Sequence, residues 1–166
     1  MPNTLAEATE RAKYLLINVK NAAMATVNEN GTPHNTPFFF IHDNKLDDIY
    51  WCSHPASLHS KNVVRTGQVF VVVYEGNTGG GLYIEADGAH ELEGVELEEG
   101  LTTHNRLRNK EGRDALNIEY YSGDNPQRMY SAQPIHFYVN YSERDQSGKL
   151  IKDVRHEISK LDLLQL

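Results

Sequence analysis

Residues 68–74 read Gln-Val-Phe-Val-Val-Val-Tyr, a continuous apolar run that is rich in β-branched side chains. Such a run is typical of a strand that is buried on both faces or lies near the interior of a barrel. Other strand-like segments accompany it at hairpin-like spacing, separated by turn signals such as Asn28-Glu29-Asn30-Gly31. We predict these strands within residues 22–28, 32–41, 48–53, 82–88, 130–141 and 150–158, with a bulge at Gly88.

Helices are predicted at the start of the chain and between groups of strands. In residues 4–19, apolar side chains recur at helical spacing behind a capping box of Thr4 and Glu7. Pro55 suits the first position of a helix over residues 55–65. Further helices are predicted over residues 95–110 and 113–121, and the apolar tail over residues 161–166 is predicted to dock on the protein. Because strands and helices do not alternate, we predict an α+β fold, mainly antiparallel β, built around a barrel.

The length and the charge of the chain limit its partners. The 166 residues fit a single domain over residues 1–166, with the barrel over residues 22–158. The net charge is −7, from 16 Lys and Arg against 23 Asp and Glu, and such a surface repels nucleic acid and anionic lipid. No apolar run reaches the roughly 18 residues that a membrane helix needs, and residues 1–20 lack the apolar block of a signal peptide. We therefore expect a cytoplasmic protein that binds neither nucleic acid nor membrane.

Cysteine and histidine spacing argues against a metal site. The lone Cys52 excludes an intramolecular disulfide and a zinc site of several thiolates, and on a predicted strand it is expected to be a small core residue. The eight His residues show no His-x-x-x-His or His-Glu-x-x-His spacing. The glycine-rich segment over residues 76–81 leads into a strand, whereas phosphate-binding glycine loops lead into a helix, so we expect a mobile hairpin connection there.

The sharpest local feature is Ser53-His54-Pro55-Ala56-Ser57-Leu58-His59-Ser60-Lys61-Asn62. A strand ends here and a helix begins, so free backbone amides and the positive end of the helix dipole would meet hydroxyl and cationic side chains. Ser57 and Lys61 are one helical turn apart and can face the same anion. The segment is suited to a phosphate monoester, and equally to a solvated helix start with a Ser cap.

Several segments, in this order and spacing, resemble the pyridoxamine-phosphate-oxidase-like FMN-binding split barrels. They are Gly31-Thr-Pro33-His-Asn-Thr-Pro37, Ile49-Tyr-Trp-Cys-Ser53, Ser57-x-His59-x-Lys61-Asn62-Val63, Gln68-Val-Phe-Val-Val-Val73, Tyr83-Ile-Glu-Ala-Asp-Gly88-Ala89 and Met129-Tyr-Ser-Ala-Gln-Pro134-Ile-His-Phe-Tyr-Val139. The resemblance covers about residues 20–158. It implies a six-stranded split β-barrel with peripheral helices that forms a homodimer with FMN at the subunit interface.

The resemblance also implies which residues hold FMN. The strand after the Gly-x-Pro turn would contact the flavin ring and ribityl chain, and the end of the next strand would flank the ribityl chain or the phosphate. The helix start would grip the phosphate, and Tyr83 stands where authentic oxidases place a flavin-binding Gln. The implied cofactor-binding residues are Asn35, Thr36, Pro37, Phe38, Cys52, Ser53, Ser57, His59, Lys61, Asn62 and Tyr83.

Two departures from the family pattern bear on function. Leu58 replaces an Arg of the usual phosphate grip, and only Arg155-His156 remains of the C-terminal motif that binds the substrate phosphate in authentic oxidases. The resemblance therefore implies an FMN-dependent oxidoreductase acting on an unknown small molecule, not pyridoxamine phosphate oxidation. A non-catalytic flavin-binding or stress-response protein stays open, as does a deazaflavin or haem protein with His54, His59 or His136 as ligands.

Aromatic residues are the sequence's only indication of where a dimer interface would lie. Tyr and Trp are enriched at interfaces, and they could equally fill the core. The candidates are Tyr50, Trp51, Tyr120, Tyr121 and Tyr130.

Overall fold

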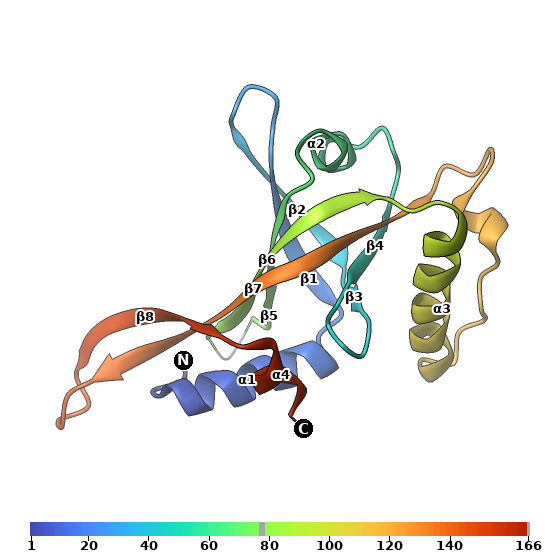
Figure 1. Ribbon diagram of the computed structural model, residues 1–166. Coiled ribbons are helices and arrows are strands. Elements are labelled where there is room, and N and C mark those ends of the chain that lie inside the picture. The colour runs from blue at the N-terminus through green and yellow to red at the C-terminus, as the bar shows by residue number, and fades with distance from the viewer. Residues whose placement is uncertain (77–78, 166) are drawn as a thin grey trace.

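The computed structural model describes residues 1–76 and 79–165 and is built around one antiparallel sheet (Figure 1). The strands follow the order β2-β1-β5-β6-β7-β4-β3, and β8 pairs with β7 outside this order. They are β1 (Asn21–Val27), β2 (Pro33–Phe39), β3 (Ile41–His42), β4 (Ile49–Ser53), β5 (Val69–Tyr74), β6 (Gly81–Glu91), β7 (Arg128–Arg144) and β8 (Leu150–Ile158). Every strand pair is antiparallel, so the predicted α+β, mainly antiparallel class is confirmed.

The two ends of the strand order belong to one stretch of chain. β2 pairs with β1 and β3 pairs with β4, and only Phe40 separates β2 from β3. The amide of Phe40 donates to the carbonyl of Lys20 at 2.7 Å, at the point where the chain changes partner. β2 contacts β4 without pairing with it, so the sheet curls into a barrel that is not closed.

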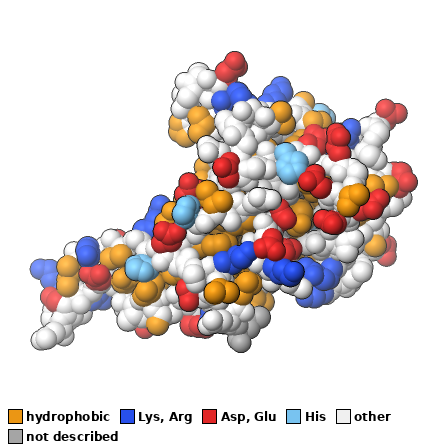
Figure 2. Space-filling view, in the orientation of Figure 1, with side chains coloured by type: hydrophobic (Ala, Val, Ile, Leu, Met, Phe, Trp, Pro, Cys, Tyr) orange, Lys and Arg blue, Asp and Glu red, His pale blue; other side chains and the backbone are white. Residues whose placement is uncertain are grey.

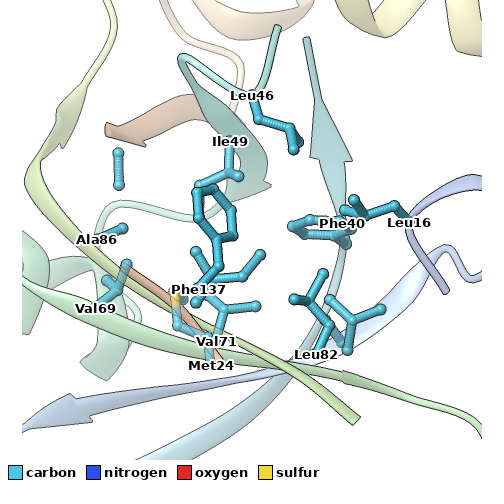
Figure 3. Packing of buried hydrophobic residues seen from close by; sticks show 14 of the residues in the cluster. Leu16, Met24, Phe40, Leu46, Ile49, Val69, Val71, Leu82, Ala86 and Phe137 are labelled. Atoms are coloured by element: carbon cyan, nitrogen blue, oxygen red, sulfur yellow. The ribbon is translucent and has the colours of Figure 1, made fainter. Parts of the chain in front are cut away.

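The barrel interior holds the main hydrophobic core, part of which Figure 3 shows. Met24, Val71, Leu82 and Ile84 are completely buried there. Along β5 the side chains alternate, with Val69, Val71 and Val73 buried while Phe70 and Val72 are only partly buried. The expectation of burial on both faces is therefore wrong, whereas the placement beside a barrel interior is confirmed. The apolar run is continuous because the outer face of β5 is apolar too.

Two helices cover one end of the barrel (Figure 1). α1 (Leu5–Asn18) buries Ala8, Ala12, Leu15 and Leu16, as the helical spacing predicts. Thr4 accepts a hydrogen bond from the amide of Glu7 at 3.2 Å, but the Glu7 carboxylate accepts from Asn3, so only half of the predicted capping box forms. The C-terminal helix α4 (Lys160–Leu164) buries Leu163, which confirms that the tail docks; residue 166 lies outside the described residues.

The other helices differ in part from the prediction. α2 (Leu58–Thr66) begins three residues later than expected, because residues 54–57 form a turn and Ser57 takes the N-cap position; Gly67, with φ 66°, follows it. α3 (Gly94–Lys110) matches the predicted segment. The helix predicted over residues 113–121 is wrong, since only the 3-10 turn η1 (Ile118–Tyr121) forms there.

Three smaller expectations concern the bulge at Gly88, the glycine-rich segment over residues 76–81 and membrane-spanning helices. The bulge at Gly88 is confirmed by its φ of 63° and by the register shift between Asp87 and His90. The loop predicted over residues 76–81 includes residues 77 and 78, which lie outside the described residues. No described helix combines the length and the apolar character that a bilayer crossing demands.

A second cluster of buried side chains lies between α3 and the outer side of β4 and β7. It contains Ile41, Tyr50, Leu92, Leu97, Leu101, Tyr121 and Met129. Of the aromatic residues considered for an interface, Tyr50 and Tyr121 belong to this cluster, and Trp51 and Tyr130 belong to the main core. Only Tyr120, at 41% exposure, is available to a partner.

Candidate functional site

The candidate site lies where the end of β4 turns into α2. Ser53 is the last residue of β4, and the chain returns through residues 54–57 to Ser57, the N-cap of α2. The amide of Ser57 donates to the carbonyl of His54 at 3.0 Å, which closes the turn and brings Ser53 and Ser57 together. This short connection places two hydroxyl groups beside the first turn of a helix.

Three serines and one histidine form a connected group, which we call the hydroxyl cluster: Ser53, Ser57, Ser60 and His59. Oγ of Ser53 lies 2.6 Å from Nε2 of His59 and 3.0 Å from Oγ of Ser57. Oγ of Ser57 lies 3.2 Å from the same His59 nitrogen and donates to Oγ of Ser60 at 2.9 Å. Ser60 is completely buried and Ser53 is 8% exposed. The cluster is therefore built into the protein rather than spread over its surface.

The imidazole of His59 has a partner on β2. The rings of His34 and His59 stack with their centroids 6.4 Å apart and an angle of 6° between their planes. Burial, and secondarily the charge that His34 can carry, lower the pKa of His59 below its usual value. The side chain of Lys61 is exposed, and its backbone amide donates to the carbonyl of Ser57 at 3.1 Å, so Lys61 stands one helical turn from the cap.

The first turn of α2 has the properties of an anion-binding site. Ser57 occupies the N-cap position but makes no side-chain cap hydrogen bond. The amides of the first helical turn have no carbonyl partner within the helix, and the helix dipole makes this end positive. With serine hydroxyls, His59 and Lys61 around it, the helix start can bind a phosphate monoester.

The residues predicted on β2 divide between two faces of the strand. Thr36 and Phe38 lie opposite Met24 and Ala22 of β1, which are buried, so they share the barrel side with His34. Phe38 packs edge-on against Trp51 with centroids 6.2 Å apart. Asn35 and Pro37 are exposed on the opposite face. The structure therefore brings Thr36 and Phe38 toward the side of the hydroxyl cluster, and Asn35 and Pro37 away from it.

Cys52 is next to Ser53 but points into a different network. Its Sγ donates to Oη of Tyr121 at 3.3 Å, and Oη of Tyr121 lies 2.9 Å from Nδ1 of His104. Burial raises the pKa of Cys52 to about 11 and lowers that of His104 to about 4, and burial also raises the pKa of Tyr121. All three groups are thus neutral at pH 7, which suits a hydrogen-bonded chain that ties β4 to η1 and α3. Cys52 is a packing residue, as the sequence indicates, and is unsuited to thiolate chemistry.

Asn62 holds α2 in place. Its Nδ2 donates to Oγ1 of Thr26 at 3.0 Å and to Oδ1 of Asn28 at 2.9 Å, and the residue is 3% exposed. Both amide hydrogens are therefore used within the protein. Asn62 positions the helix start relative to β1 and has no free donor for a ligand.

Tyr83 lies far from the hydroxyl cluster within one chain. It pairs with Tyr138 on β7, whereas Ser53 pairs with Arg128 on the same strand. At about 3.3 Å per residue this register separates them by roughly 30 Å along β7. On the outer face of the sheet, the guanidinium of Arg155 lies 4.0 Å from the centre of the Tyr83 ring.

Sequence reasoning missed His34, Tyr121 and His104 as members of this region. The signal for His34 was available, since it stands two residues before Thr36 and a strand repeats its faces every two residues. Tyr121 and His104 reach Cys52 through tertiary packing alone, for which the sequence gives no signal. Among the described residues, no group of three or more His, Cys, Asp or Glu side chains is placed to hold a metal ion.

Neither a protein-family model nor a curated protein matches the chain. Solved structures do match. A pyridoxamine 5'-phosphate oxidase-related, FMN-binding protein from Nostoc punctiforme superposes with a TM-score of 0.53 and 12% identity, over 91% of this chain and 93% of that one. A second match is a protein from Clostridium acetobutylicum that is related to general stress protein 26, of the pyridoxinephosphate oxidase family. It superposes with a TM-score of 0.59 and 14% identity, over 90% of this chain and 94% of that one.

The chain has the fold of the pyridoxamine 5'-phosphate oxidase-like proteins. The split-barrel fold implied by the sequence resemblance is thereby confirmed. A haem-binding protein from Mycobacterium smegmatis shares the fold, with a TM-score of 0.64 and 12% identity. The match covers 95% of this chain, but the chain spans only 60% of the length of that protein. Proteins described as FMN-binding and as haem-binding thus share the split-barrel fold. The fold alone therefore does not determine which cofactor a protein binds.

Proposed function

We propose that this protein binds FMN, with the phosphate of FMN at the hydroxyl cluster and the first turn of α2. The observation that carries the proposal is the group of contacts among Ser53, Ser57 and His59 at an N-cap that lacks a side-chain cap. Hydroxyl groups can donate to phosphate oxygens, and the free amides of the helix start complement the negative charge. The family pattern has an Arg at the position of Leu58, and that cation is missing here. Lys61, one helical turn from Ser57, supplies a cation instead.

The rest of the cofactor would extend from this phosphate along β2. Thr36 and Phe38 lie on the face of β2 that carries His34, the partner of His59. Asn35, Pro37 and Tyr83 lie on the outer face of the sheet and would reach a flavin only across an interface between two copies of the chain. The proposal therefore includes a homodimer with FMN at the interface.

The outer face of the sheet supports such an interface. Val27, Phe70 and Ile135 line one hollow of this face, and Val27 and Ile135 are exposed by 48% and 50%. Exposed apolar side chains that gather in one place are typical of a surface that another protein covers. A stable monomer that binds FMN tightly, measured by light scattering, would contradict the dimer.

We further propose that the protein is an FMN-dependent oxidoreductase acting on a small molecule. FMN, when bound, supplies the two-electron redox chemistry, and the protein supplies position and electrostatics. No side chain needs to act as acid or base for electron transfer to a flavin, which agrees with the neutral, hydrogen-bonded state of Cys52, Tyr121 and His104. Oxidation of a reduced nicotinamide with an added electron acceptor tests this part, and a flavin-loaded protein without turnover would favour a non-catalytic flavin-binding function.

Haem is the second candidate, because the mycobacterial haem-binding protein shares the fold. His54 is exposed, and its Nδ1 accepts from the amide of Ala56 at 3.0 Å, which leaves Nε2 for a ligand. Nδ1 of His136 lies 2.6 Å from the Glu157 carboxylate, which likewise leaves its Nε2 for a ligand, whereas Nε2 of His59 is engaged with Ser53. The absorption spectrum of the purified protein distinguishes haem from flavin.

The decisive experiment compares FMN with riboflavin, which lacks the phosphate. Fluorescence titration of the apoprotein is expected to give tighter binding of FMN than of riboflavin. The S53A/S57A variant is expected to lose this preference, and S147A, in the turn between β7 and β8, is expected to keep it. Equal affinity of the wild-type protein for both ligands would contradict a phosphate site at the hydroxyl cluster.

A further inference from the structure

Several elements meet at the end of the barrel opposite α2 (Figure 1). A cavity lies among them. The C-terminal half of α1, the β2–β3 junction, the β3–β4 turn, the C-terminal half of α3 and α4 surround a volume of about 420 Å³. Small-molecule sites in proteins commonly have volumes of about 300–1,000 Å³. The cavity is therefore large enough for a small organic ligand.

The floor of the cavity is apolar. Leu16, Phe40 and Leu46 line it, and each is at most 5% exposed (Figure 3). These side chains also belong to the main core, so the floor is a packed part of the fold. Leu163 and Leu164 of α4 add apolar surface on one side. Such a floor favours a hydrocarbon or aromatic body over a hydrated ion.

The rim of the cavity is cationic. Lys13, Lys20, Arg106 and Lys110 line it, and none of the described residues that line it is Asp or Glu. This contrasts with the chain as a whole, whose net charge is −7. Figure 2 shows Lys and Arg side chains gathered on this side of the molecule near the lower part of α3.

Most of these cations have no carboxylate partner. Lys13 pairs with Glu10 at 2.7 Å. Lys20 donates to the carbonyl of Ile17 at 3.1 Å, and among the described residues Lys20, Arg106 and Lys110 form no ion pair. Lys110 lies in the last turn of α3 and complements the helix dipole there, and Lys20 binds a last-turn carbonyl of α1. Arg106 lies outside the last turn of α3. The two helix ends therefore account for Lys20 and Lys110, but not for Arg106.

We propose that this cavity binds an amphipathic organic carboxylate, with its apolar body on the Leu16, Phe40 and Leu46 floor and its carboxylate among Lys20, Arg106 and Lys110. Arg and Lys recognise carboxylates by charge-assisted hydrogen bonds. A neutral ligand would leave the cations unused, and a cationic amphiphile would be repelled. The site is separate from the hydroxyl cluster, so it does not depend on FMN binding.

Decanoate is the probe, and its binding to the apoprotein is followed by amide chemical-shift changes and by calorimetry. The amides of Leu16, Phe40, Leu46 and Leu107 are expected to shift. The R106Q/K110Q variant is expected to bind decanoate about five- to thirtyfold more weakly, because each exposed charge pair contributes modestly. The matched control K149Q/K152Q removes the same charge near the β7–β8 turn and is expected to bind as the wild-type protein does.

Three outcomes would overturn the proposal. They are shifts located elsewhere or absent up to millimolar decanoate, equal affinity for decyltrimethylammonium, and unchanged decanoate affinity in a folded R106Q/K110Q variant. The I17D variant gives a second measure, because Ile17 is 52% exposed, lines the cavity and tolerates substitution without loss of core packing. Its added carboxylate is expected to weaken decanoate binding. The S53A/S57A variant is expected to bind decanoate normally, so failure of one proposed site is distinguishable from failure of the other.

Discussion

Nε2 of His59 lies 2.6 Å from Oγ of Ser53, at the point where β4 turns into α2. Burial and the neighbouring His34 lower the pKa of His59, so the ring is neutral at pH 7 and both groups are hydrogen-bonding partners without a charge. Leu58 stands where the family pattern has a permanently charged Arg, and His59 next to it is a group that can gain a charge. The proposed phosphate site is therefore expected to respond to pH.

FMN binding is expected to tighten severalfold as the pH falls from 8 to about 6.5. A phosphate dianion beside His59 favours the imidazolium, so binding takes up a proton and is favoured at lower pH. Below about pH 6 the phosphate itself gains a proton and the trend ends. Fluorescence titration of FMN measures this effect, with riboflavin as the ligand that shows no such trend. An unchanged pH profile in H59Q would show that His59 is not the responsible group.

Substitution of Asn62 is expected to destabilise the protein without direct loss of a ligand contact. N62A removes both donors that reach Thr26 and Asn28, and the buried Thr26 hydroxyl loses a partner. The expected loss is about 1–3 kcal/mol in the free energy of unfolding, measured by urea denaturation. The neighbouring exposed K61Q is expected to change it by less than about 0.5 kcal/mol. A double-mutant cycle with T26V should show coupling, and strict additivity would contradict the assigned contact.

The sequence predicts the strands well because apolar alternation and turn residues are local signals. It fails for residues 113–121 because the segment is held by tertiary contacts: the side chain of Asn105 on α3 both accepts from the Leu116 amide and donates to its carbonyl, each at 2.8 Å. It misplaces the start of α2 because Ser57, not the residue before Pro55, takes the cap position.

The same distinction applies to the site. Ser53, Ser57 and His59 are close in the chain, and the structure brings them together as their spacing predicts. The side-chain amide of Asn62 donates both of its hydrogens to Thr26 and Asn28, which are more than thirty residues away in the chain. Tyr83 and Ser53 are far apart because of the register with which β6 and β4 pair with β7. Packing fixes this register, and no local sequence pattern does.

The protein is expected to lose stability in mild acid through His104. The pKa of this ring is about 4 in the folded protein, against 6.5 for an unperturbed histidine, mainly because the ring is buried and secondarily because Arg108 is near. The unfolded chain therefore binds more protons below pH 6.5, and the stabilisation present above that pH is lost as the pH falls toward 4. Between pH 7 and pH 5 the loss is about 2 kcal/mol.

Urea denaturation at several pH values separates this contribution from others. H104Q keeps an acceptor for the Tyr121 hydroxyl and removes the titrating ring, so its free energy of unfolding should fall less between pH 7 and pH 5 than that of the wild-type protein. The exposed H156Q serves as the control and should follow the wild-type curve. Parallel curves for H104Q and the wild-type protein would contradict the role of His104.

Leu46 is expected to reverse the usual order of alanine and glycine substitutions. It has a φ of 53°, in the left-handed region, yet its side chain is 1% exposed at the floor of the cationic cavity. The carboxylate of Asp43 accepts hydrogen bonds from the amides of Lys45, Asp47 and Asp48, which fixes the turn and holds Leu46 in this conformation. The chain thus tolerates backbone strain at one residue in exchange for burying a large apolar side chain.

Both L46A and L46G are expected to destabilise the protein by roughly 2–5 kcal/mol, because a buried leucine is removed. L46G should nevertheless be more stable than L46A by about 1 kcal/mol, since glycine adopts positive φ without steric cost. Leu82 on β6 is completely buried and does not have a positive φ, so there the usual order holds and L82G should be less stable than L82A. Thermal or urea denaturation of the four variants measures both comparisons. If L46G is less stable than L46A, the left-handed conformation of Leu46 contributes no strain.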